Sequence, residues 1–224
     1  MDPFSSDPVD ITSLRGQALT KGGLLCNELR RRAWTKLLGI NIYNIPSCSH
    51  LDHKDKNQVI LDVNRCGRCL PKELLIERIN SIQDSLIRVL LRLLVTHTDL
   101  CYYQGLHDVV LTFLLLPLNE NITFAIMNVL VQYHIRDCLY PDIGRTKELR
   151  INDSQLESFI TRSECEYYFS LSWILTWYSH VVYDRDDLLM LTDLFLASHP
   201  LMPIYVATVL ITVVGLRYWN RTVR

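Results

Sequence analysis

The sequence predicts an all-α protein, because apolar residues recur at helical spacing along most of its length. The most regular series lies in the middle of the chain and comprises Leu75, Ile79, Ile82, Leu86, Val89 and Leu93. Proline and glycine separate the periodic segments, and no pair of alternating apolar runs joined by a short glycine turn indicates a β-hairpin. The periodic segments are therefore expected to be helices packed side by side.

Composition places the chain among globular proteins with one hydrophobic core. Of its 224 residues, 49% are hydrophobic and 21% are charged, which is too apolar for a disordered chain. The formal net charge of −1 gives no overall field that would attract nucleic acid, so nucleic-acid binding is not expected. The start of the chain lacks the basic and apolar segments of a secretory signal. The seven cysteines are therefore expected to be reduced thiols in the cytosol.

The amino-terminal part predicts a flexible leader followed by a helix. Residues 1–20 are rich in proline, serine, aspartate and glycine and show little periodicity, so we expect them to be loose. Over residues 23–39, apolar residues recur about every fourth position, which predicts a helix that ends at a glycine. In this helix Trp34 is expected at the edge of the core, and Arg31 and Arg32 on a solvated basic face.

A loop over residues 40–56 and a short helix are expected next. The helix follows from apolar and polar residues at positions i, i+3, i+4 and i+7, which are Val59, Asp62, Val63 and Cys66. Asp62 and Arg65 are three positions apart and are expected to be neighbours on the helix surface. On local chemistry alone, such a pair is usually a surface salt bridge of little energetic consequence.

Three helices are predicted in the central part. A long helix is expected from Pro71 onwards, since the first turn of a helix tolerates proline, and it contains the regular apolar series. Residues 106–116 are apolar nearly all round, which predicts a helix buried on most sides. A third helix is expected over residues 123–138.

Towards the end of the chain the pattern predicts mixed short helices over residues 145–163 and helices over 164–183 and 186–197. Phe169, Trp173 and Trp177 form an aromatic stripe, which is more often part of a core than of a ligand site.

The last apolar run, residues 201–216, has three interpretations. It is about sixteen residues long, shorter than the roughly twenty that a membrane-spanning helix needs. Its proline and β-branched residues are also compatible with a strand. We favour a core helix first, a buried strand second and a membrane anchor third.

The motifs of common enzymes are missing from the sequence. Cys66 and Cys69 form a C-x-x-C pair, but no second pair of zinc ligands is visible, so no metal or redox site is expected. The histidines are scattered, and no serine or cysteine lies in a recognisable nucleophile turn. With eight glycines and no glycine-rich phosphate loop, the chain is not expected to bind a nucleotide by itself.

The polar, aromatic stretch over residues 99–105 interrupts two apolar runs. Its local chemistry fits an ordinary connection between helices in which Gly105 supplies the bend. Gln104 in this stretch offers one acceptor and two donors, enough to align a water molecule against a phosphate oxygen. Arg65, with its permanent charge, could supply the other part that GTP hydrolysis needs. Generic chemistry leaves both interpretations of this stretch open.

Three motifs resemble the signature motifs of TBC-domain Rab GTPase-activating proteins, in the order of that family. They are Arg30-x-x-x-Trp34-x-x-Leu37-Leu38-Gly39, Val59-x-x-Asp62-x-x-Arg65 and Tyr102-x-Gln104-Gly105. Three stretches, residues 58–66, 102–110 and 199–205, resemble one particular branch of the family. The resemblance runs from about residue 24 to about residue 210 and implies a right-handed array of helices.

The resemblance also implies a function. Arg65 and Gln104 would enter the site of a Rab-family GTPase in trans, the arginine stabilising charge on the phosphates and the glutamine positioning the attacking water. Asp62 would hold Arg65, while Tyr102 and Gly105 would shape the glutamine loop. GTP and Mg²⁺ would belong to the partner, so no cofactor of its own is expected. The chain would be a regulator of another protein's hydrolysis in the early secretory pathway, on the cytoplasmic side of the endoplasmic reticulum or Golgi membrane.

The sequence departs from the family's pattern mildly at two positions and more clearly at its end. Val59 replaces the usual isoleucine and Cys66 the usual threonine. Such domains continue with several more helices, and this branch has a membrane anchor near its carboxyl terminus, which would provide any membrane association. We therefore expect a domain over residues 21–216 that is incomplete at its end, an absent anchor and a basic tail over 217–224. A non-catalytic protein that binds a Rab or acts as a scaffold is the alternative.

Overall fold

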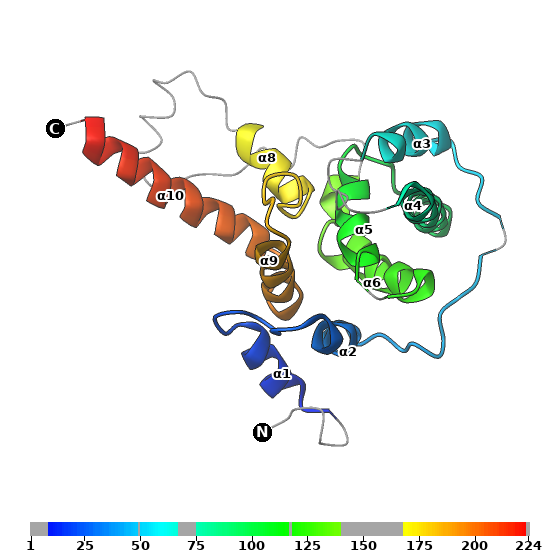
Figure 1. Cartoon of the computed structure of the whole chain (residues 1–224), viewed down its shortest axis with the longest axis horizontal. Helices are drawn as coiled ribbons and strands as arrows, with labels where there is room; N and C mark the ends of the chain where they lie inside the picture. Colours follow the sequence, from blue (N-terminus) through cyan, green and yellow to red (C-terminus); the bar gives the residue numbers. More distant parts are fainter. Residues whose placement is uncertain (1–8, 49, 67–74, 117, 140–167, 223–224) are drawn as a thin grey trace.

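The structure is a computed structural model that describes residues 9–48, 50–66, 75–116, 118–139 and 168–222. Throughout these residues every regular element is a helix, so the predicted all-α fold is confirmed (Figure 1). The elements are α1 (Ile11–Ala18), α2 (Asn27–Leu37), α3 (Lys56–Arg65), α4 (Ile76–Thr96), α5 (Leu106–Leu114), α6 (Glu120–Tyr133), η2 (Arg136–Leu139), α8 (Tyr168–Leu175), α9 (Arg185–Ala197) and α10 (Met202–Thr222).

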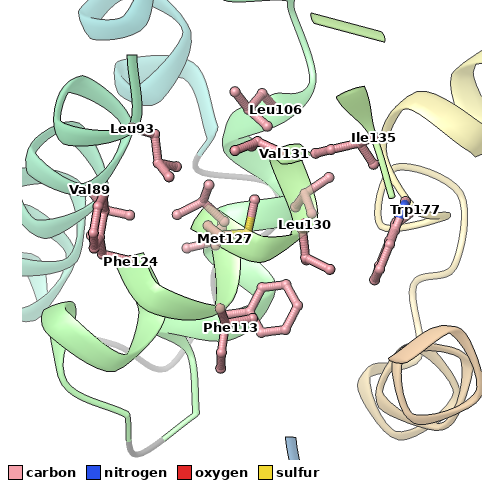
Figure 2. Close-up of a cluster of buried hydrophobic side chains, with 14 of the residues drawn as sticks. Val89, Leu93, Leu106, Phe113, Phe124, Met127, Leu130, Val131, Ile135 and Trp177 are labelled. Carbon is pink, nitrogen blue, oxygen red and sulfur yellow. The ribbon is translucent and has the colours of Figure 1, made fainter. Parts of the chain in front are cut away.

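The centre of the fold is α4, which packs against α3, α5 and α6. A cluster of buried apolar side chains fills this centre and extends to Trp177, in the turn after α8 (Figure 2). Its labelled members are Val89, Leu93, Leu106, Phe113, Phe124, Met127, Leu130, Val131, Ile135 and Trp177. Because α5 is apolar nearly all round, it can be buried on most sides, as the sequence predicts.

A second group of helices lies beside this centre. Helix α9 packs against α1, α2 and α10, and α10 also packs against α8. Figure 1 shows α2 and α3 on opposite sides of the group formed by α4, α5 and α6, while α10 extends outward to one side. The two groups meet where α2 contacts both α6 and α9.

The expected leader is wrong over residues 11–18, which form α1. Asp10 caps this helix, because its side chain accepts a hydrogen bond from the Ser13 backbone N–H at 3.0 Å. Leu14 and Ala18, one turn apart, are buried against α2 and α9. Two buried positions are too short a series for the sequence pattern to reveal.

Most of the remaining helices lie close to where they were expected. The apolar series of α4 is buried at Ile82, Leu86, Val89 and Leu93, but Leu75, at the amino-terminal cap, is 77% exposed. The expected start of this helix at Pro71 lies outside the described residues. Helix α6 begins at Glu120, three residues earlier than predicted, because Asn119 caps it by accepting from the Ile122 N–H at 2.8 Å.

The predicted aromatic helix over residues 164–183 is shorter than expected. Helix α8 ends at Leu175, and both Trp177 and Tyr178 follow it in left-handed backbone conformations, with φ of 48° and 66°. Such angles strain residues with side chains by about 1–2 kcal/mol each. Burial of both rings offsets this strain, and Trp177 packs edge-to-face on Phe195 with ring centroids 5.3 Å apart. The side chain of Phe169 lies outside the described residues.

The last apolar run forms a helix, α10, which continues to Thr222 and so includes most of the residues expected as a separate tail. Only part of it is core. Ala207 is buried, whereas Leu201, Tyr205, Val209 and Val213, at four-residue intervals, are 44–59% exposed. Among the described residues, no helix has the length and apolar character to cross a membrane.

Candidate functional site

Arg65 is the last residue of α3 and is exposed to solvent. Helix α3 buries Val59, Asp62 and Val63 on the face that packs against α4 and α5. Among the described residues, no carboxylate forms an ion pair with Arg65. Its guanidinium is therefore available to a partner molecule.

Asp62 does not lie on the helix surface beside Arg65, so the expected surface pair is wrong. The residue is 3% exposed, and both of its carboxylate oxygens accept hydrogen bonds from other side chains. Gln58 Nε2 donates to Oδ1 at 3.0 Å, and the Tyr102 hydroxyl donates to Oδ2 at 3.1 Å. Asp62 is therefore bound by Gln58 of α3 and by Tyr102 of the loop before α5, and not by Arg65.

Gln104 lies at the exposed tip of the loop before α5, between two buried residues. Tyr103 is turned inward, and its hydroxyl donates to the Leu175 carbonyl at 2.8 Å. Gly105 has φ of +112°, a conformation that residues with side chains rarely adopt. A Cβ at this position would lie 2.9 Å from Cγ2 of Thr176. The loop is thus seated against the end of α8, and only glycine fits at its last position.

Backbone groups of the glutamine loop are also held by the elements on either side. The Tyr102 N–H donates to Oδ2 of Asp55, the residue that precedes α3, at 3.0 Å. The Cys101 N–H donates to the Leu139 carbonyl in η2 at 2.8 Å. Together with the bond between Tyr102 and Asp62, these contacts fix the loop that presents Gln104 to the helix that presents Arg65.

The hydroxyl of Tyr102 belongs to a buried polar network. Besides Asp62, it lies 2.9 Å from Nδ1 of His107. His107 Nε2 lies 3.5 Å from Asp108 Oδ1, and the other oxygen of Asp108 lies 3.5 Å from His180 Nδ1. These side chains connect α3, the glutamine loop, α5 and the turn after α8.

Burial and nearby negative charge keep the Tyr102 phenol and the Cys66 thiol protonated. Burial, and then the negative charge of Asp62, raise the pKa of Tyr102 far above its ordinary value, so the phenol remains a hydrogen-bond donor at neutral pH. Burial, with a smaller contribution from Asp108, raises the pKa of the Cys66 thiol to about 11. Cys66 is therefore an inert core thiol at neutral pH rather than a nucleophile.

Arg30 and Trp34 lie elsewhere, on α2, and take part in a buried cluster with Asp193 of α9. Arg30 Nε donates to Asp193 Oδ2 at 3.0 Å, and Trp34 Nε1 donates to Oδ1 at 2.7 Å. The Leu24 N–H also donates to Oδ2, at 2.9 Å. Trp34 is fully buried and packs edge-to-face on Phe113 at 5.2 Å between ring centroids, so its expected place at the core edge is wrong. This first motif fixes α2 to α9 and does not meet the exposed Arg65 and Gln104.

Among the described residues, no group of three or more histidine, cysteine, aspartate or glutamate side chains could hold a metal ion. Cys69 of the C-x-x-C pair lies outside the described residues. What the site offers is a cation and a carboxamide on two exposed positions of joined elements.

Several site residues were missed in the sequence. Asp55, His107, Asp108 and His180 hold the glutamine loop or its network, and Asp193 holds the first motif. A signal was present for two of them, since Asp108 and Asp193 are carboxylates within apolar helices. Buried charges require partners, so each of these positions predicts a polar contact.

The fold and the site together define a helical domain in which an exposed arginine and an exposed glutamine lie on joined elements. A family comparison identifies the class. Residues 27–215 match the Rab-GTPase-TBC domain, and the chain belongs to this family.

Individual relatives agree with that assignment. The chain is 38% identical over 221 residues to TBC1 domain family member 20 of Homo sapiens, with 93% of the chain and 54% of the relative covered. It is 39% identical over 220 residues to the Mus musculus protein of the same name, at the same coverage. GTPase-activating protein gyp10 of Schizosaccharomyces pombe is 32% identical over 197 residues, covering 82% of the chain and 52% of the relative.

These matches confirm the branch that residues 58–66, 102–110 and 199–205 resemble, which is that of TBC domain family member 20. The chain spans about half the length of the curated relatives that it matches.

Proposed function

We propose that this chain is a GTPase-activating protein for a Rab-family small GTPase, with Arg65 and Gln104 inserted into the partner's site. The observation that carries this proposal is the 3.1 Å hydrogen bond from the Tyr102 hydroxyl to Asp62 Oδ2. Asp62 lies one turn before Arg65, and Tyr102 lies two residues before Gln104. The bond therefore joins the two exposed side chains into one unit that a single GTPase surface can meet.

Each of the two residues has a distinct task. The guanidinium of Arg65 can donate several hydrogen bonds to phosphate oxygens. It stabilises the negative charge that develops as the γ-phosphoryl group is transferred. The carboxamide of Gln104 accepts from the attacking water and donates towards the phosphoryl group, which orients the water in line with the bond that breaks.

The nucleotide and Mg²⁺ are supplied by the GTPase in this proposal. Support comes from the sequence, which has no glycine-rich phosphate loop. The chain then accelerates a reaction whose substrate it does not bind alone, which makes it a regulator rather than an enzyme with its own substrate.

The resemblance to the branch named above favours a Rab of the early secretory pathway and an action at the cytoplasmic face of the endoplasmic reticulum or Golgi membrane. A panel of Rab proteins tests this part of the proposal. GTPases of that pathway should show the largest acceleration, and a preference for Rab proteins of another compartment would contradict the assignment.

Single-turnover hydrolysis of GTP on purified Rab proteins tests the activity itself. An arginine supplied in trans accelerates hydrolysis by roughly 10³–10⁵-fold. We expect Arg65→Ala to remove nearly all of this acceleration and Gln104→Ala to remove most of it. Arg78→Ala, which removes an exposed arginine from α4, is the matched control and should leave the rate unchanged.

Three outcomes would count against the proposal. Folded protein that accelerates no Rab would refute the activity. Acceleration that survives both Arg65→Ala and Gln104→Ala would refute the mechanism. Binding to a GTP-loaded Rab without acceleration would instead support the alternative of a non-catalytic Rab-binding or scaffold protein.

A further inference from the structure

The direction of the hydrogen bonds at Tyr102 can be deduced from the number of protons available. A phenol has one proton to donate, and a carboxylate can only accept. Both oxygens of Asp62 act as acceptors, since Gln58 donates to Oδ1 and Tyr102 to Oδ2. The short contact of 2.9 Å between the Tyr102 oxygen and His107 Nδ1 then requires the proton on the histidine. His107 must therefore donate from Nδ1.

His107 lies beside a buried carboxylate. The residue is 8% exposed, and Nε2 of its ring lies 3.5 Å from Oδ1 of Asp108, which is itself 5% exposed. The other carboxylate oxygen of Asp108 lies at the same distance from Nδ1 of His180, in the turn after α8. Asp108 thus lies between two imidazoles, one inside the fold and one whose side chain is 65% exposed.

The same turn after α8 also supports the glutamine loop directly. Tyr103 donates to the Leu175 carbonyl, and Gly105 is in close contact with Thr176. The loop is consequently held from two sides, through Tyr102 towards α3 and through Tyr103 and Gly105 towards α8. Without His107, only the bond to Asp62 would orient the phenol of Tyr102.

We infer that His107 is a positioning residue for Gln104, acting through Tyr102 to keep the glutamine loop aligned with the end of α3. This inference rests on the proposed function of Gln104, but the alignment itself is a property of the free chain. The His107 side chain is not expected to touch GTP. Its removal should change how fast the bound complex reacts more than how tightly it forms.

Substitutions at His107 distinguish this role from simple core packing. His107→Asn places an amide nitrogen near the position of Nδ1 and keeps a donor for Tyr102, whereas His107→Leu fills similar space without one. His134→Leu is the matched control, because it removes another partly buried histidine that does not contact Tyr102. All variants should show cooperative thermal unfolding before they are compared.

The first measurement uses the chain alone. We expect His107→Leu to accelerate hydrogen exchange by at least about threefold in peptides covering residues 58–65 and 100–106, because the bond network that joins them is broken. His107→Asn and His134→Leu should leave both peptides close to the unmodified protein. Unchanged exchange in His107→Leu, or equal acceleration in His107→Asn, would overturn the inference.

The second measurement is single-turnover GTP hydrolysis at increasing concentrations of the chain. His107→Leu should lower the maximal rate about tenfold, as expected for loss of one hydrogen bond in an aligned site, while the half-saturating concentration changes less than about twofold. Recovery of the rate in His107→Asn would support the positioning role, and a change confined to the half-saturating concentration would refute it. If the unmodified chain accelerates no Rab, the proposed function fails, and the exchange measurement alone decides whether His107 aligns the loop.

Discussion

Replacing Asp193 by asparagine is expected to destabilise the fold strongly, and the geometry shows why. Asp193 Oδ2 accepts from the Leu24 N–H and from Arg30 Nε, while Oδ1 accepts from Trp34 Nε1. An asparagine of the same size has only one oxygen. In one orientation its NH₂ group faces the N–H donor of Trp34, and in the other it faces the donors of Leu24 and Arg30.

The size of this destabilisation follows from burial of the Arg30 charge, which remains after the substitution. The Asp193 side chain is 0% exposed and that of Arg30 is 4% exposed, so the guanidinium cannot turn to water when its carboxylate is lost. Breaking a buried ion pair by removing one partner costs about 3–5 kcal/mol. Because domains of this size are stable by roughly 5–15 kcal/mol, the variant should lose a large part of its free energy of unfolding.

Urea denaturation followed by circular dichroism measures this loss. Asp187→Asn, which neutralises an exposed carboxylate on the same helix, is the control and should cost less than about 1 kcal/mol. The double variant Arg30→Gln with Asp193→Asn removes the unpaired charge and should be more stable than Asp193→Asn alone by about 1–3 kcal/mol. A loss below about 1 kcal/mol in Asp193→Asn, or a double variant as unstable as the sum of the two single ones, would refute the reasoning.

Two other substitutions have definite expected outcomes. Gly105→Ala should destabilise the fold by about 1–3 kcal/mol and reduce acceleration of the Rab, because φ is +112° and the new Cβ would lie 2.9 Å from Thr176 Cγ2. Thermal unfolding and single-turnover hydrolysis measure the two effects. Burial, with a smaller contribution from His199, lowers the pKa of His134 from 6.5 to about 4. As the pH falls, His134 therefore takes up a proton in the unfolded chain before it does so in the folded chain. The free energy of unfolding should consequently fall by at most about 3 kcal/mol between pH 6.5 and pH 4. In urea titrations over this range, His134→Phe should lose that part of the pH dependence.

Each of these expectations has a comparison that can contradict it. Gly39 also has a positive φ, +64°, but a Cβ there would meet no atom within 4 Å. Gly39→Ala should leave acceleration of the Rab unchanged, and an equal loss in both glycine variants would show that contact with Thr176 is unimportant. For His134, parallel curves of stability against pH in the two proteins would show that its proton is not involved.

The sequence pattern predicts the helices well where each has a long buried stripe. Helix α4 has seven buried residues over its 21 positions, and α5 is apolar nearly throughout, so periodicity alone locates them. Helix α1 has two buried residues and was missed. The end of α8 was misplaced because Trp177 and Tyr178 follow it in left-handed conformations, which an aromatic stripe at helical spacing cannot indicate.

At the site, the sequence locates two exposed positions but not the contacts around them. Arg65 lies at the end of the expected short helix and Gln104 in the expected loop. Arg65 was expected beside Asp62 from spacing along one helix, whereas one of the two actual donors to Asp62, Tyr102, is 40 residues away in the sequence. Contacts between distant residues depend on how the helices pack, and spacing along one helix does not reveal this.

The cluster around Asp193 also has a consequence for synthesis of the chain on the ribosome. Arg30 and its partner are separated by 163 residues, so the arginine is made long before the carboxylate that it needs. At about 5–20 residues per second, the interval is roughly 8 to 33 seconds. During this time Trp34 and the apolar face of α2 have no α9 to cover them. A nascent chain halted within that interval would leave the surface of α2 that α9 covers accessible to chaperones.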